Sequence, residues 1–259
     1  MRSIAKLMKD WQFTGPNGVT TAVELPHTWN ARDGQDGGND YWRGCCTYCT
    51  RFAAPVYDPA QQQVWLQFEG VNASAAVLLN GQQLCTHDGG YSTFRAEVTE
   101  LLQAENQLTV RVDNSVNDRV YPQKADFTFY GGIYRDVSLL VVNKNHIALG
   151  HFGDTGVKIT PTLKEGSADI QVETLVEGEG TVVVELLDAE GSTVAKGEGS
   201  KTSLHLDAPH LWNGVKDPYL YTCVVRLLQD GKPVDEVTTK VGLHSFSVDP
   251  KKGFFLNGR

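Results

Sequence analysis

The sequence has no long apolar run and no run of basic residues. No stretch approaches the roughly 18 apolar residues of a membrane-spanning helix, and the opening MRSIAKLMKDWQF has too short an apolar run for a signal peptide. The formal net charge is -8, whereas nucleic acids and anionic membranes are bound through clustered Lys and Arg. We therefore expect a cytoplasmic protein with neither nucleic acid nor membrane as a partner.

The motifs of common catalytic and metal sites are also missing. The chain has no Gly-rich phosphate loop, no HExxH and no GxSxG. CTYC (46–49) has the spacing of half a zinc site, but no second ligand pair follows it. We therefore interpret its two cysteines as small buried side chains on a strand. Three of the five cysteines crowd together at Cys45, Cys46 and Cys49, which does not fit a disulfide framework.

An amphipathic helical period is absent as well, because nearly every segment alternates with a period of two and ends in turn residues. This pattern predicts an all-β chain. Asn80-Gly81 and Asp230-Gly231 predict two-residue hairpin turns, and Glu190-Gly191 predicts a third hairpin. The one helix-like piece, 95–107, is expected to form no more than a short turn near its two leucines.

Composition divides the chain near residue 143. Four of the five tryptophans and the long glycine-bearing loops precede this point, and a lean, Val-rich sequence follows it. The lengths fit a jelly-roll β-sandwich over residues 1–143 and an immunoglobulin-like β-sandwich over 144–244, with 245–259 as the start of a linker.

Two segments combine acidic residues with aromatic ones, GGNDYWRG (37–44) and DFTFYGG (126–132). Carboxylates and amides bind sugar hydroxyls, and aromatic faces stack on the apolar side of a sugar ring. A carbohydrate site is one interpretation of these segments. The alternative is that they are ordinary Asp-Gly turns beside core aromatic residues.

Eight motifs, in order, give the whole chain a resemblance to the N-terminal portion of a glycoside hydrolase family 2 enzyme. This family includes β-galactosidase, β-glucuronidase and β-mannosidase. The motifs are LPHTWN (25–30), DYWRGCCTYCTRF (40–52), VWLQFEGVNASAAVLLNG (64–81), GGYSTFRAEVTELL (89–102), NQLTVRVDN (106–114), GGIYRDVSLL (131–140), LWNGVKDPYLYT (211–222) and GFFLNG (253–258).

The resemblance implies a jelly-roll domain and an immunoglobulin-like domain, followed after residue 259 by a TIM barrel. The family cleaves β-glycosides with retention, using two Glu side chains of the barrel whose carboxyl groups lie about 5 Å apart. We therefore expect no catalytic residue in these 259 residues and no activity from this part alone.

The resemblance also implies site residues. It places Asp126 in the sugar subsite of a β-galactosidase, beside a bound sodium ion, and it makes Asn39 or Asp40 a second sugar ligand with Tyr41 near the same rim. Thr128 and Phe129 depart from the family pattern, because the family's galactosidases usually carry a Trp and an Arg between that Asp and the glycine. Magnesium would belong to the full-length enzyme.

The same resemblance suggests an explanation for two adjacent glycines at positions 131 and 132. They would let a bulky loop turn back sharply into a strand. The Arg135-Asp136 pair that follows is expected to brace that turn through a charge-assisted hydrogen bond between the two side chains.

These observations favour the noncatalytic N-terminal part of a β-galactosidase, with a β-galactoside and its own TIM barrel as partners in a homo-oligomer. A β-glucuronidase is the first alternative, although a carboxylate at Asp126 would repel a uronic acid. A freestanding carbohydrate-binding module is the second alternative, and it predicts sugar binding by the isolated chain.

Overall fold

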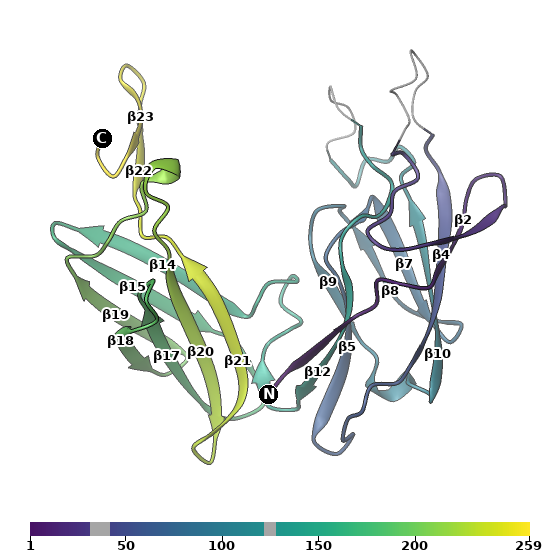
Figure 1. The fold of residues 1–259 in the computed structure, drawn as a ribbon, viewed down its shortest axis with the longest axis horizontal. Coiled ribbons are helices and arrows are strands. Elements are labelled where there is room, and N and C mark those ends of the chain that lie inside the picture. The colour runs from purple at the N-terminus through teal and green to yellow at the C-terminus, as the bar shows by residue number, and fades with distance from the viewer. Residues whose placement is uncertain (32–41, 122–127) are drawn as a thin grey trace. The chain divides into compact units, whose positions relative to one another are not determined.

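The computed structural model describes residues 1–31, 42–121 and 128–259 (Figure 1). The regular elements of these ranges are strands and two short 3-10 helices, which confirms the predicted all-β class. The chain divides into two compact units, one formed by Ser3–Val141 and one by Val142–Arg259 together with Met1–Arg2. In the described ranges, no helix is long and apolar enough to cross a membrane.

The first unit is a jelly-roll sandwich with a six-stranded sheet in the order β3-β2-β4-β10-β7-β8 and a four-stranded sheet in the order β1-β12-β5-β9. A short pair, β6 with β11, lies beside them. The strands are β1 (Ser3–Lys6), β2 (Trp11–Thr14), β3 (Thr20–Val23), β4 (Cys45–Ala53), β5 (Gln62–Phe68), β6 (Val71–Asn72), β7 (Ser74–Leu79), β8 (Gln82–Asp88), β9 (Phe94–Glu97), β10 (Glu105–Asp113), β11 (Gly132–Ile133) and β12 (Val137–Asn143).

Alternation along the strands builds the core of this unit. In β4 and β10 every second side chain is buried, as a period of two requires when one face of a sheet is covered. Trp11, Tyr48 and Phe68 are among the largest side chains with no exposed surface. This core holds the strand ends from which the loops of the unit project.

The second unit is an immunoglobulin-like sandwich of a three-stranded sheet, β14-β15-β19, and a four-stranded sheet, β18-β17-β20-β21. Three plus four strands is the constant-type arrangement. Figure 1 labels the strands of both sheets. The strands are β13 (His146–Ile147), β14 (Val157–Lys164), β15 (Ser167–Thr174), β16 (Val176–Glu177), β17 (Thr181–Leu187), β18 (Thr193–Glu198), β19 (Lys201–Asp207), β20 (Tyr221–Gln229), β21 (Lys232–Val241), β22 (Phe246–Asp249) and β23 (Gly253–Leu256).

The predicted turns are present. Asn80 and Gly81 have φ of 51° and 83°, and Asp230 and Gly231 have φ of 50° and 72°, so both pairs adopt the left-handed conformations of a type I′ turn. Gly191, with φ of 86°, lies between the paired strands β17 and β18. The short helical turn is a 3-10 helix at Thr99–Leu101.

The cysteines are all free thiols, and three of them lie on β4. The prediction of buried small side chains is right for Cys46, which is 2% exposed, but Cys49 is only partly buried. Cys45 is exposed, because adjacent residues of a strand point to opposite faces and Cys45 and Cys46 are neighbours.

Candidate functional site

Several described segments meet at one end of the first sandwich. β10 ends at Asp113, which pairs with Cys45 of β4 and Ser74 of β7, and both of these strands begin there. The segments 27–31, 42–44, 114–115 and 128–132 leave the strands at this end, and we call them the loop end. Residues 32–41 and 122–127, outside the described part of the chain, adjoin these segments in sequence.

Two buried asparagines connect the segments of the loop end. The Asn30 Oδ1 atom accepts from the backbone N–H of Gly131 at 2.8 Å and from Asn114 Nδ2 at 3.2 Å. Asn30 Nδ2 donates to the Trp42 carbonyl at 3.0 Å, and Asn114 Oδ1 accepts from the Gly44 N–H at 2.8 Å. Asn30 and Asn114 are 0% and 5% exposed. Each side chain supplies both a donor and an acceptor without carrying a charge, so burial is tolerated.

A third asparagine adds to this network. Asn72 lies in β6 and donates from Nδ2 to the Tyr130 carbonyl at 2.8 Å. Thr28 Oγ1 donates to the Gly131 carbonyl at 2.8 Å. Side chains therefore bind the Tyr130 carbonyl and both backbone polar groups of Gly131. In a regular strand, the backbone of a neighbouring strand would bind these groups.

The packing of this end explains the two adjacent glycines. A Cβ atom on Gly131 would lie 2.3 Å from Trp29 Cζ2 and 2.6 Å from Asn114 Nδ2. A Cβ atom on Gly132 would lie 2.5 Å from the His27 carbonyl oxygen, and its φ of 135° also favours glycine. Close approach of two other segments is therefore the reason for both glycines, and a turn is only part of it.

An aromatic cluster lies directly beneath the loop end. Phe13 stacks on Trp29 with ring centres 5.9 Å apart, and Trp42 meets Trp29 edge-on at 6.1 Å. His27 Nδ1 and the Tyr48 hydroxyl are 2.7 Å apart. Burial lowers the pKa of His27 and raises the pKa of Tyr48, so both side chains are neutral near pH 7 and the cluster carries no charge.

The rim of the loop end carries exposed aromatic rings. Trp42, Tyr91, Tyr121 and Tyr130 are 38%, 52%, 72% and 42% exposed. A small crevice among Asn72, Tyr91, Asn114 and Tyr121 has a volume of about 20 Å³, which is room for about one water molecule. This crevice is therefore too small to enclose a sugar, and its rings and amides can contact a ligand only from the surface.

Four residues predicted for the sugar site, Asn39, Asp40, Tyr41 and Asp126, lie outside the described residues. Their positions stay predictions, as does the sodium ion at Asp126. In residues 1–31, 42–121 and 128–259, no group of three His, Cys, Asp or Glu side chains is placed to hold a metal ion.

The predicted Arg135-Asp136 brace is wrong in its partners. Asp136 forms an ion pair with Lys6 of β1 at 2.6 Å. Arg135 Nη1 donates to the carbonyls of Glu69 and Tyr91 at 3.3 and 3.0 Å. The two side chains bind different segments, Asp136 on β1 and Arg135 on backbone near the ends of β5 and β9. Both still brace the chain entering β12, as the structural interpretation expects.

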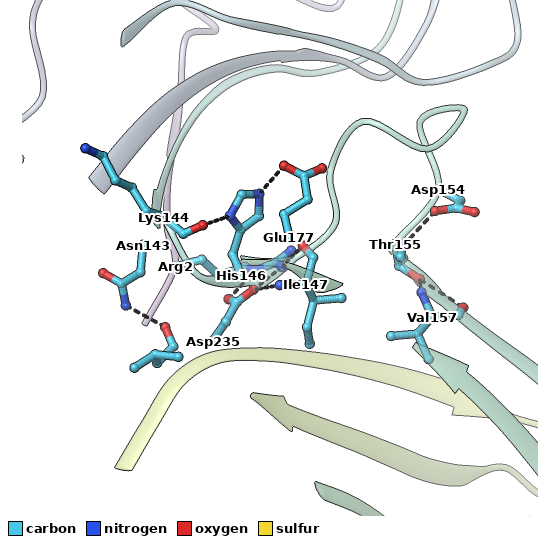
Figure 2. Close-up of polar contacts among 12 residues, drawn as sticks. Arg2, Asn143, Lys144, His146, Ile147, Asp154, Thr155, Val157, Glu177 and Asp235 are labelled. Atoms are coloured by element: carbon cyan, nitrogen blue, oxygen red, sulfur yellow. Dashed lines mark hydrogen bonds and ion pairs between the residues drawn. The ribbon is translucent and has the colours of Figure 1, made fainter. Parts of the chain in front are cut away.

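The second unit has its own buried polar cluster, shown in Figure 2. Arg2 donates from Nε and Nη2 to the two carboxylate oxygens of Asp235 at 2.7 and 2.6 Å, and the Ile147 N–H donates to Asp235 Oδ2 at 2.8 Å. His146 Nε2 lies 3.5 Å from Glu177 Oε2. Because Asp235 is fully buried with its carboxylate bound on both oxygens, we interpret this cluster as structural.

The sequence analysis did not identify Asn30, Asn72 and Asn114 as residues of this end. A weak signal was present for two of them, since Asn30 ends the motif LPHTWN and Asn114 ends NQLTVRVDN. A polar residue directly after an alternating strand marks the end of its ladder. Nothing in the sequence indicates that these asparagines bind one another.

Comparison with known proteins places the chain among glycoside hydrolases. The family model "Glycosyl hydrolase 2 galactose-binding domain-like" matches residues 38–162, and "Glycosyl hydrolases family 2" matches residues 151–244. A β-glucuronidase of Bacteroides fragilis is 34% identical over 98% of this chain and 39% of its own length.

Two solved structures are similar over the whole chain. One is an FMN-binding β-glucuronidase from Facaelibacterium prausnitzii L2-6, with 36% identity, a TM-score of 0.94 and coverage of 42% of that protein. The other is a putative β-galactosidase from Bacteroides fragilis, with 36% identity, a TM-score of 0.91 and coverage of 43%. The chain thus spans about two fifths of the length of these proteins.

Proposed function

The chain belongs to glycosyl hydrolases family 2, and from this premise we propose that it is the noncatalytic N-terminal region of a retaining β-glycosidase. One observation carries the proposal. Both sandwiches match a relative with a TM-score of 0.94, yet they cover only 42% of it. The two Glu side chains that a retaining mechanism needs are then assigned to a TIM barrel in the remainder of the protein.

Within that enzyme, we assign the loop end of the first sandwich to the sugar subsite. The exposed rings of Trp42, Tyr91, Tyr121 and Tyr130 support this role, because a sugar ring stacks on aromatic faces. Buried amides that hold irregular backbone give the rim a fixed shape, as a preorganised site requires. The second sandwich is proposed to support the barrel.

The first candidate substrate is a β-glucuronide, since relatives named β-glucuronidase match the chain at 34% and 36% identity. The second candidate is a β-galactoside. It is favoured by the 36% identical putative β-galactosidase and by Asp126, whose carboxylate would accept the 6-hydroxyl of galactose but repel a uronate. Sodium at Asp126, magnesium and a homo-oligomeric state belong to the proposal for the full-length enzyme.

The test is hydrolysis of p-nitrophenyl β-glucuronide and β-galactoside by the full-length enzyme, with the 259-residue chain assayed beside it. Activity of the full-length enzyme on either substrate, and none from the chain alone, supports the proposal. If the full-length protein is inactive on both while the chain binds oligosaccharides, the chain is a binding module and the proposal fails.

The two substrates are separated by Asp126→Ala, with exposed Asp118→Ala as the matched control. In a galactosidase, Asp126→Ala lowers kcat/KM about a hundredfold, or about 3 kcal/mol of transition-state stabilisation, and Asp118→Ala leaves it unchanged. Preference for glucuronide, with Asp126→Ala harmless or favourable, selects the first candidate.

A further inference from the structure

At each end of β10, a buried asparagine forms a hydrogen bond with a second asparagine. At the loop end, Asn114 Nδ2 donates to Asn30 Oδ1 at 3.2 Å, and Asn114 Oδ1 accepts from a backbone N–H, that of Gly44. At the opposite end, Asn106 Oδ1 accepts from Asn80 Nδ2 at 3.1 Å and from the Gln103 N–H at 2.9 Å. Asn106 is 2% exposed and Asn114 is 5% exposed.

The two pairs differ in what they hold. Asn106 also donates to the Gln103 carbonyl at 2.7 Å, and Asn80 donates to the Leu101 carbonyl at 3.1 Å. The Asn80-Asn106 pair therefore joins the turn between β7 and β8 to the connection that leads into β10, away from the loop end. The Asn30-Asn114 pair binds backbone at positions 42, 44 and 131, so it joins the four segments of the loop end.

The backbone held by the Asn30-Asn114 pair carries two exposed rings of the rim, those of Trp42 and Tyr130. Trp42 contributes its own carbonyl to the pair, and Gly131, which directly follows Tyr130, contributes its N–H. A change in this pair therefore displaces the backbone beside both rings together.

We propose that Asn30 and Asn114 are positioning residues of the sugar subsite, which fix the backbone beside the exposed rings of Trp42 and Tyr130. The inference rests on the proposed function. The asparagines touch neither sugar nor reacting atoms; they act by holding the backbone of positions 42, 44 and 131. Binding energy in a preorganised site falls when the supporting backbone shifts, and a displacement of about 1 Å costs up to about a hundredfold in rate.

The test is steady-state kinetics of the full-length enzyme carrying Asn114→Ala, with Asn106→Ala as the matched control on the same strand. Each variant removes one buried asparagine that binds another asparagine and a backbone N–H. Stability is followed by thermal unfolding, and kinetics are measured where both variants are folded. Asn114→Ser, which keeps a hydroxyl near the Gly44 N–H, replaces Asn114→Ala if that variant does not fold.

The split between KM and kcat separates positioning from stability. Partial unfolding reduces the amount of active enzyme, so it lowers apparent kcat and leaves KM unchanged, whereas a displaced binding segment raises KM. We expect Asn114→Ala to raise KM about 10- to 100-fold and Asn106→Ala to leave KM within about twofold at a similar loss of thermal stability.

Two results would overturn the inference while the proposed function stands. They are an unchanged KM in Asn114→Ala and Asn114→Ser, or an equal rise of KM in Asn106→Ala. A wild-type enzyme inactive on both glycosides overturns the proposed function first and the inference with it. If the two asparagines act as one network, Asn30→Ala and Asn114→Ala should each raise KM. The double variant should then raise KM by less than the product of the two separate factors.

Discussion

Replacing Asp235 by Asn should selectively destabilise the second unit. The carboxylate is 1% exposed and binds Arg2 through both oxygens, at 2.7 and 2.6 Å. Its Oδ2 atom also accepts from the Ile147 N–H at 2.8 Å. An amide is nearly the same size but has only one acceptor oxygen, so in either orientation its NH₂ group must face an N–H of Arg2, and in one orientation it also faces the Ile147 N–H.

We expect Asp235→Asn to lower the free energy of unfolding of the second unit by about 3 kcal/mol. Removing one partner of a buried ion pair costs about 3 to 5 kcal/mol, and we take the lower value because the Arg2 side chain is 16% exposed and regains some hydration. For a unit of this size, that corresponds to a fall of about 10 °C in the midpoint of thermal unfolding. The measurement is urea unfolding of the 259-residue chain, with hydrogen exchange to assign the loss to a unit.

The control is Glu173→Gln in the same unit. Glu173 is 45% exposed, and its carboxylate lies 4.0 Å from Lys158 and from Lys201. Exposed pairs of this kind contribute about 0 to 1 kcal/mol. The reasoning fails if Asp235→Asn costs less than about 1 kcal/mol, or if the exchange data place its loss in the first unit.

A double variant tests the cause of the loss. Arg2→Met with Asp235→Leu removes both charges, and replacing a buried ion pair by apolar residues is often neutral. Here it should recover only part of the stability. The Ile147 N–H loses its acceptor, and an unsatisfied buried donor costs about 1 to 3 kcal/mol.

Three further predictions concern single side chains. Gly131→Ala should cost about 2 kcal/mol in urea unfolding, because its Cβ would lie 2.3 Å from Trp29 Cζ2; a neutral effect would contradict the close approach described above. Burial lowers the pKa of His27, so stability should be complete above about pH 6.5 and fall as the pH drops from there toward the folded pKa. His27→Gln should flatten that pH dependence, and an unchanged slope would exclude His27 as its source. Burial raises the pKa of Cys46 to about 12 and of Cys223 to about 11, so N-ethylmaleimide near neutral pH should modify neither before unfolding. Rapid labelling of either in the folded chain, detected by mass spectrometry, would contradict their burial.

The sequence predicts the body of each sandwich well because a period of two has a direct structural meaning. Alternation in β4 and β10 fixes which side chains are buried, and Asn80-Gly81 and Asp230-Gly231 determine their turns through backbone conformation. These are local properties. A residue and its immediate neighbours are enough to decide them.

Side-chain partners were predicted less well because they depend on residues far away in sequence. Arg2 binds Asp235 across 233 positions, and Asp136 binds Lys6 of β1 while its neighbour Arg135 binds two backbone carbonyls. Adjacency in sequence suggested a bond between Arg135 and Asp136, but the order of strands places β1, with Lys6, beside β12. That order, and not adjacency, decides which segment each side chain meets.

The difference between the two units also follows from how each satisfies its backbone. In the second unit, short turns at Gly191 and Gly231 join strands that pair directly with one another, so the backbone on both sides of these turns binds within ladders. At the loop end of the first unit, Asn30, Asn72 and Asn114 satisfy backbone groups that have no ladder. Loop backbone that is fixed by side-chain hydrogen bonds can adopt a shape that fits a ligand, whereas backbone paired in a sheet has only the regular shape of a strand. A sugar contact made by this chain is therefore expected in the first unit.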